Sequence, residues 1–307
     1  MIDTHCHLNF QAFATDLPDV VRRAKQNGVE QFIVPGTDLI SSKKAIDLSL
    51  AYPDAIFASI GIHPHHAQDP NFYPNDTLKI QLSEMISKNR KQVVAIGEIG
   101  LDFFVYQKTK YENREVSPEI IAKQIALLNM QLSIAHDFDL PVILHCRKAF
   151  PQMIKIIKLY HDKYQTISAY ASHFAKASLV KKNNSRRSSA SDVKTNYIKP
   201  YQVHGVWHCF TGSTQDLEAL ITMGYYIGFD GNITYSPDYS TLVDSTPLNR
   251  ILLETDAPYL SPIPMRGKRN TPSNILIIAE TVAKYHHTPL SQVIHISTSN
   301  AQKLFKI

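Results

Sequence analysis

Short apolar runs alternate with amphipathic stretches along most of the chain. Eight runs have the length and the Val, Ile and Leu content typical of buried β-strands. They cover residues 1–7, 31–34, 55–61, 92–97, 141–144, 205–207, 225–229 and 250–255. Strands that alternate with helices predict a parallel sheet, and eight such units predict an α/β fold of the (β/α)8 TIM-barrel type.

Helical spacing of apolar residues fills the intervals between these runs. The clearest case is 117–137, where apolar residues stand at 120, 121, 125, 128 and 132 and form one stripe of a helix. Ser41 is predicted to cap a helix, and either Ser213 or Thr214 to cap another. The remaining predicted helices cover 19–27, 76–90, 150–164, 272–285 and 289–304.

Composition places the chain among ordinary soluble proteins. Of its 307 residues, 44% are hydrophobic and 19% are charged, which is typical of a globular domain. No apolar run approaches the roughly 20 residues that a membrane span needs, and no signal peptide precedes the first strand. The odd number of cysteines, Cys6, Cys146 and Cys209, argues against a disulfide framework. We therefore expect one cytoplasmic domain over 1–307, with these cysteines as small buried residues.

The net charge of +5 is concentrated in one segment. Residues 176–199 contain seven Lys or Arg and one acidic residue, so this segment carries +6 and the rest of the chain −1. The surrounding Ser and Asn residues leave no apolar face. This basic insert, at about 176–200, is predicted to be a solvated loop; the alternative is an arm that contacts the phosphate backbone of a nucleic acid.

Imidazole and carboxylate side chains stand near the ends of five predicted strands. The carboxyl ends of parallel strands in a barrel open on one face, and that face holds the active site. Two histidines that are two residues apart on a strand project to the same side. Histidines and carboxylates converging there form the ligand set of a hydrolytic metal centre. The candidate metal ligands are His5, His7, Glu98, His145, His208 and Asp256.

Taken singly, several of these residues have ordinary explanations. Glu98 alone would be a solvated loop residue, and His145 or His208 alone a satisfied buried histidine. Together, however, His145 and His208 fit one metal ion, and the two oxygens of Glu98 can bridge two cations. Asp256 ends a very apolar strand, where a buried charge needs a partner, and a cation with an activated water would provide one.

An ordered set of motifs runs almost from end to end of the chain. The segments are 5–7, 61–64, 97–102, 140–147, 208–212, 254–259, 266–270, 300–301 and 304–305. Together they resemble the TatD family of metal-dependent deoxyribonucleases. The resemblance implies an amidohydrolase-type barrel that hydrolyses DNA phosphodiester bonds with two divalent ions, which are Mg, Mn or Zn.

Position by position, the resemblance assigns one ion to His5, His7 and Asp256 and the other to His145 and His208. Glu98 bridges the two and sets their spacing, while Asp256 orients the attacking water and accepts its proton. DNA is the expected substrate, without a membrane or an obligate protein partner.

Four further residues are predicted to contact substrate at the mouth of the barrel: His63, Arg147, Arg266 and Asn270. Arginine suits bidentate phosphate contacts, and His63 can reach an oxyanion. Lys148 stands where the family usually has an aspartate, which removes an expected partner of the ligands or of Arg147.

Two other functions remain open from the sequence. The same ligands would serve an amidohydrolase or esterase, for example one acting on aminoacyl esters. Against the commonest form, Glu98 occupies the position where such enzymes carry a carbamate-forming lysine. A non-catalytic nucleic-acid-binding module that uses the basic insert is the second alternative, and the complete ligand set argues against it.

Overall fold

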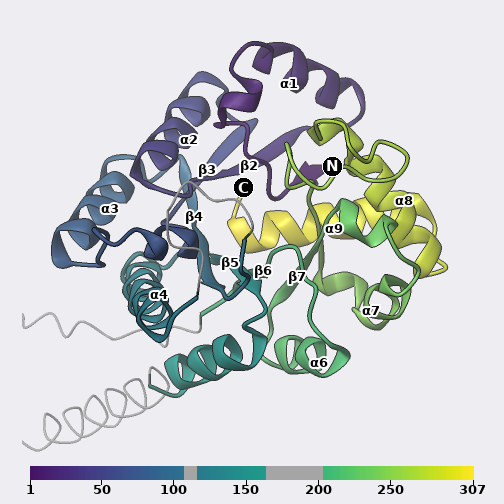
Figure 1. Cartoon of the computed structure of the whole chain (residues 1–307). Coiled ribbons are helices and arrows are strands. Elements are labelled where there is room, and N and C mark those ends of the chain that lie inside the picture. Colours follow the sequence, from purple (N-terminus) through teal and green to yellow (C-terminus); the bar gives the residue numbers. More distant parts are fainter. Residues whose placement is uncertain (107–115, 164–202) are drawn as a thin grey trace, which may run out of the picture.

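Eight parallel strands form the centre of the fold. The computed structural model describes residues 1–106, 116–163 and 203–307. In these parts the strands follow one another around the sheet in chain order, and helices surround them (Figure 1). The strands are β1 (Ile2–Asp3), β2 (Gln31–Pro35), β3 (Ile56–Ile60), β4 (Val93–Asp102), β5 (Val142–Arg147), β6 (Gly205–Trp207), β7 (Tyr226–Phe229) and β8 (Ile251–Leu253).

Contacts between the first and last strands nearly close the sheet. Cys6 forms an isolated parallel bridge with Ala257, and the backbone N–H of Thr4 donates to the carbonyl of Leu253 at 3.1 Å. The predicted TIM barrel is therefore confirmed. Because the strands are parallel, all their carboxyl ends open on the same face.

Most helices lie where the apolar spacing predicts them, with differences at their ends, but the helix at residues 239–245 was not predicted. They are α1 (Leu17–Gln26), α2 (Leu39–Ala51), α3 (Asp76–Lys88), α4 (Pro118–Phe138), α6 (Thr214–Thr222), α7 (Tyr239–Ser245), α8 (Ile275–Tyr285) and α9 (Leu290–Phe305). Residues 150–163 are also helical. Ser213 caps α6 as predicted, accepting a hydrogen bond from the N–H of Asp216. The prediction for Ser41 was wrong: Asp38 caps α2, and Ser41 completes the capping box inside the helix.

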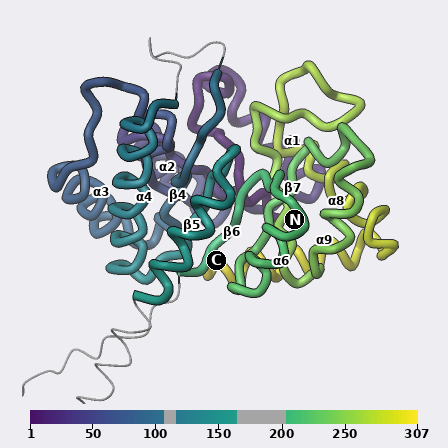
Figure 2. The backbone as a smooth tube through the Cα atoms, turned by 60° about the horizontal axis from the view of Figure 1, so that its bottom comes forward, coloured from purple at the N-terminus to yellow at the C-terminus, as the bar shows by residue number. Residues whose placement is uncertain are grey.

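The end of the barrel opposite the strand carboxyl ends is filled with apolar side chains. Inward-facing residues such as Ile33, Val94 and Leu252 form one buried cluster with Leu304 and Phe305 of α9. Figure 2 shows α9 passing below the strands. Burial of this cluster leaves only the other end of the barrel open for polar chemistry.

Strands β4 and β5 are longer than predicted. Glu98 and His145 lie within these strands rather than after them, because pairing resumes from Ile99 to Asp102 beyond a register shift. Two glycines permit the close approach of the strands. A Cβ on Gly97 would lie 2.5 Å from that of Ile143, and one on Gly100 would collide with the His145 carbonyl. These glycines therefore allow the side chain of Glu98 to stand beside β5.

The basic insert predicted at about 176–200 lies outside the described residues. The described chain before it is the helix at 150–163, so the insert does not follow β5 directly. Within the described ranges, none of the helices combines the length and the apolar character required to cross a bilayer.

Candidate metal centre

The six predicted ligands converge at the carboxyl ends of the strands. Strand β1 ends at Asp3, so His5 and His7 follow the strand instead of lying on it. The bridge at Cys6 keeps the chain extended there, and both imidazoles reach the same side as expected. Their Nε2 atoms are 3.2 Å apart. Asp256 Oδ1, beyond β8, lies 3.4 Å from Nε2 of His7 and 3.7 Å from Nε2 of His5.

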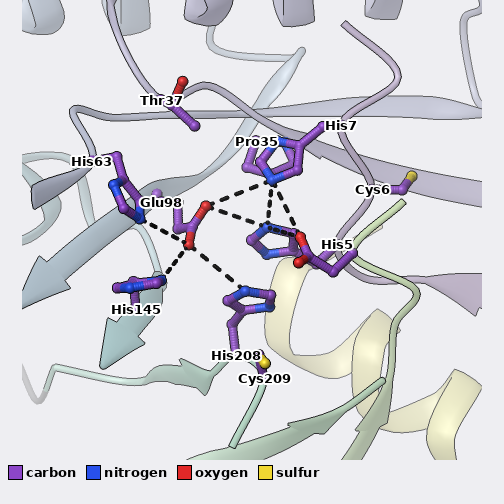
Figure 3. Close-up of polar contacts among 12 residues, drawn as sticks. His5, Cys6, His7, Pro35, Thr37, His63, Glu98, His145, His208 and Cys209 are labelled. Carbon is purple, nitrogen blue, oxygen red and sulfur yellow. Dashed lines mark hydrogen bonds and ion pairs between the residues drawn. The ribbon is translucent and has the colours of Figure 1, made fainter. Parts of the chain in front are cut away.

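Glu98 lies between the two halves of the cluster and directs one oxygen toward each (Figure 3). Its Oε2 is 3.5 Å from Nε2 of His5 and 3.7 Å from Nε2 of His7. Its Oε1 is 2.7 Å from Nδ1 of His145 and 3.7 Å from Nε2 of His208. The carboxylate thus has the placement that a bridging ligand needs.

Burial and mutual charge determine the protonation of this cluster. Burial lowers the pKa of His5, so its ring is neutral and able to donate a lone pair. Burial by itself would raise the pKa of Glu98, but nearby His63 and hydrogen bonds from His145 hold that pKa well below its usual value. An ionised carboxylate beside neutral imidazole is the state that a divalent ion requires.

Glu254 holds the ring of His208 and was missed by the sequence analysis as a site residue. Its fully buried Oε1 lies 2.9 Å from Nδ1 of His208 and accepts a hydrogen bond from the N–H of Cys209 at 2.6 Å. Burial alone would lower the pKa of His208, but Glu254 raises that pKa to about 10. Since Glu254 binds the side of the ring that faces away from Glu98, it is a positioning residue.

Asp102 plays the corresponding part for His145. Its Oδ2 lies 3.2 Å from Nε2 of His145 and accepts a 2.6 Å hydrogen bond from the hydroxyl of Tyr106. Arg147 in turn donates to that hydroxyl at 3.1 Å. The acidic partner of His145 is therefore Asp102 and not the residue at position 148. Arg147 is linked to the same carboxylate through the hydroxyl of Tyr106. An acid ending a buried strand was the available sequence signal for both Asp102 and Glu254.

The donor atoms fit divalent cations. Ligand atoms of His5, His7 and Asp256 all lie within 4.8 Å of one another, and so do those of His63, Glu98 and His145. Such groups of imidazole nitrogen and carboxylate oxygen bind Zn²⁺, Mn²⁺ or related ions. A cation would also compensate the charges of carboxylates that are otherwise buried at high cost.

The predicted substrate contacts lie in three different environments. His63 joins the cluster, with Nε2 3.5 Å from Oε1 of Glu98. Arg147 and Arg266 are exposed and lie over aromatic rings, those of Phe104 at 3.9 Å and Tyr235 at 4.3 Å.

Asn270 differs from the other three because its side chain is fully buried. Its amide group donates to the carbonyls of Thr255 at 2.8 Å and Tyr259 at 2.7 Å. Its Oδ1 accepts from the backbone N–H of Thr271 and the side chain of Asn274. Asn270 is therefore buried rather than exposed at the mouth of the barrel, and it holds the loop that carries Asp256. Its contact with substrate stays a prediction.

The cysteines stay out of the cluster. Cys6 and Cys146 are buried, and Cys209 is partly buried. Figure 3 shows the sulfur of Cys6 turned away from the histidines on either side of it. Burial raises the pKa of the Cys6 thiol well above its usual value, which keeps it from acting as a thiolate ligand.

Comparison with known proteins identifies relatives over nearly the whole length of the chain. The sequence profile of the family described as TatD related DNase matches residues 2–306. The chain is 32% identical over 309 residues to the uncharacterized metal-dependent hydrolase YabD of Bacillus subtilis, covering 100% of this chain and 99% of that protein. It is 31% identical over 315 residues to the 3'-5' ssDNA/RNA exonuclease TatD of Erwinia tasmaniensis, covering 100% of both.

A solved structure shows the same arrangement. The crystal structure of YJJV, a TatD homolog from Escherichia coli, superposes with a TM-score of 0.77 at 26% identity, covering 100% of this chain and 98% of that one. The similarity therefore extends through the strands that carry the cluster.

Proposed function

Because the chain belongs to the TatD-related DNase family of metal-dependent hydrolases, we propose that it is a deoxyribonuclease with a two-metal centre. The observation that carries the proposal is the division of Glu98 between the two halves of the cluster. Oε2 faces His5 and His7, while Oε1 faces His145 and His208. A carboxylate with one oxygen on each side is suited to holding two ions a fixed distance apart.

Each ion has its own protein ligands in this proposal. His5, His7 and Asp256 would hold one, His145 and His208 would hold the other, and Glu98 would be shared. Bound divalent ions of this kind polarise a phosphodiester and lower the pKa of a water molecule toward neutrality. The geometry leaves the metal identity open among Mg, Mn and Zn.

The side chains around the ions bind substrate and move a proton. Asp256 Oδ1 orients the attacking water and accepts its proton. His63, which already faces Glu98, contacts an oxygen of the scissile phosphate. Arg147, at the end of β5, and Arg266, in the exposed loop after β8, contact the phosphates on either side of the scissile one.

Single-stranded DNA, cleaved from its 3' end, is the proposed form of the substrate. The support comes from the relative in Erwinia tasmaniensis, whose name describes a 3'-5' ssDNA/RNA exonuclease and whose match covers the whole chain. RNA is the second candidate on the same ground.

Hydrolysis of an amide or carboxylic ester remains the rival function. Against its commonest form, β4 presents Glu98, which cannot form the carbamate that a lysine would supply at that place.

The test compares oligonucleotides of single-stranded DNA, duplex DNA and RNA, each labelled at the 5' or the 3' end, with aminoacyl and p-nitrophenyl esters. The metal-stripped protein is assayed after addition of Mg²⁺, Mn²⁺ or Zn²⁺, with Glu98→Ala as the control for contaminating nuclease. We expect stepwise shortening from the 3' end of single-stranded DNA. Hydrolysis of the esters alone would refute the proposal.

A further inference from the structure

A cavity of about 410 Å³ lies beside the metal centre. Its walls come from three segments that follow adjacent strands of the barrel: residues 9–12 after β1, residues 37–44 after β2, and Pro258 with Tyr259 after β8. The cavity is therefore on the face that carries the cluster. Its volume is within the range of pockets that hold small organic ligands.

Two aromatic rings connect this cavity with the metal ligands. Phe10 stacks on the ring of His7, with centroids 4.3 Å apart and an interplanar angle of 14°. Tyr259 meets Phe10 edge-on at 6.4 Å and His7 at 6.3 Å. Although it lies against these rings, Tyr259 is 54% exposed. A flat ring therefore remains available for a ligand next to the ion site.

The position of Tyr259 is held by its backbone. Its N–H donates to the carbonyl of Asp256 at 2.8 Å, and its carbonyl accepts from the buried amide of Asn270 at 2.7 Å. Both bonds link the tyrosine to the segment that carries a metal ligand. A ligand stacked on Tyr259 would therefore be held at a fixed position relative to the metal centre.

The charges of the side chains that line the cavity cancel. Lys44 and Asp38 are the two charged residues among those lining it. Asp38 caps α2, accepting hydrogen bonds from the N–H and the hydroxyl of Ser41 at 2.7 and 2.6 Å. A wall without net charge favours a neutral aromatic group, whereas a phosphate is drawn to the cation site beside it.

We propose that this cavity, lined by Phe10 and Tyr259, binds the unpaired base of the nucleotide next to the scissile phosphate. The inference rests on the proposed nuclease function and deepens it. Aromatic side chains bind bases through their faces, with little dependence on sequence. A base in a duplex is covered by its neighbours and must leave the stack to reach such a pocket. The cavity thus gives a physical reason for preferring single strands.

The first experiment pairs Tyr259→Ala with removal of the base. On a single-stranded oligonucleotide, the variant should lose about 5- to 150-fold in kcat/KM, the range expected for one base–aromatic stack. Two further oligonucleotides carry an abasic unit, one on the 5' side and one on the 3' side of the cleaved bond. With one of these two substrates, the variant and the parent should have the same kcat/KM. A loss that persists with both abasic oligonucleotides would overturn the proposal.

Tyr73→Ala is the matched control. Tyr73 is 55% exposed, close to the value for Tyr259, and it does not line the cavity. Its side chain lies under Lys123 at 4.0 Å. The control should cleave both intact and abasic oligonucleotides like the parent. A base-dependent loss as large as that of Tyr259→Ala would count against the assignment of the cavity.

The second experiment does not need catalysis. Trp207, the one tryptophan of the chain, is buried, so Tyr259→Trp adds an exposed fluorophore at the cavity. Thymidine and adenosine should quench its fluorescence saturably, and ribose 5-phosphate should not. Quenching in a protein that cleaves no nucleic acid would support base binding in the cavity and reject the proposed nuclease activity. Equal responses to nucleoside and sugar phosphate would reject the base cavity, whatever the activity.

Discussion

Glu254 supports His208 from the side opposite Glu98. The fully buried Oε1 of Glu254 lies 2.9 Å from Nδ1 of His208, while Nε2 of the same ring lies 3.7 Å from Oε1 of Glu98. One ring nitrogen is thus occupied by a carboxylate, and the other is left for an ion. A partner of this kind orients the imidazole and increases its basicity.

Glu254→Gln should therefore weaken metal binding by about 10- to 100-fold, the usual effect of losing such a partner. The measurement is chelator competition, and saturating metal should restore part of kcat. Glu280→Gln, a change at an exposed glutamate of α8, is the control. Parental metal affinity in Glu254→Gln would show that His208 does not need this support.

Glu98→Ala should abolish nuclease activity without unfolding the barrel, because it removes the carboxylate between the two halves of the cluster. Activity, metal content and a thermal unfolding curve test this together. The paired change His5→Ala and His7→Ala should reduce the metal content from two ions to one. Glu84→Ala is the control, since Glu84 is an exposed residue paired with Lys88. Full activity of Glu98→Ala would reject the two-metal proposal.

Arg266→Ala should raise KM more than it lowers kcat. The guanidinium lies over Tyr235 in the exposed loop after β8. The phosphate contact proposed for it would exist in both the bound substrate and the transition state. Steady-state kinetics on a single-stranded oligonucleotide measure both constants. Arg22→Ala, at an exposed arginine paired with Asp19 on α1, should change neither. An unaltered KM with a collapsed kcat would mean that Arg266 acts in the chemical step.

Asn270→Ala should destabilise the protein, since it removes the donors for the buried carbonyl of Thr255 and the partly buried carbonyl of Tyr259. Each buried acceptor left without a partner costs about 1–3 kcal/mol. Urea unfolding gives the change in the free energy of unfolding. Asn274→Ala is the control, because it removes one donor to Asn270 and leaves both carbonyls satisfied. If the variant is as stable as the parent but has a raised KM, Asn270 contacts the substrate.

The metal-free protein should become less stable as the pH rises from about 7 to 10. Burial alone would lower the pKa values of His145 and His208, but neighbouring carboxylates raise them to about 9 and about 10. Both exceed the ordinary value of about 6.5 for an unfolded chain. The stabilising contribution is therefore fully present below pH 6.5 and disappears as the pH rises through these values.

Urea unfolding with a chelator, repeated across this pH range, measures the effect. Glu254→Gln should flatten the part of the profile that belongs to His208. Added metal should remove the loss, because ion binding requires the neutral rings. If the free energy of unfolding of the metal-free protein does not change across this pH range, the charges assigned to His145 and His208 are wrong.

The sequence by itself determined the barrel and the set of candidate ligands. Alternation of strand-length apolar runs with helical stripes is a local property, and it predicted the strands and most helices. The candidate ligands could also be found from the local sequence at the strand ends, because parallel strands bring their carboxyl ends to one face. His5, Glu98 and His208 therefore meet in space as predicted, although they are far apart in the chain.

Tertiary structure decided which atoms face one another. The register shift between β4 and β5, made possible by Gly97 and Gly100, directs the two oxygens of Glu98 to different histidines. It also sets Asp102 against His145, and the pairing of β7 with both β6 and β8 sets Glu254 against His208. The burial of Asn270 could not be predicted for the same reason, because it depends on how the loop after β8 folds back. Such relationships depend on the packing of distant segments, and no local pattern of residues carries them.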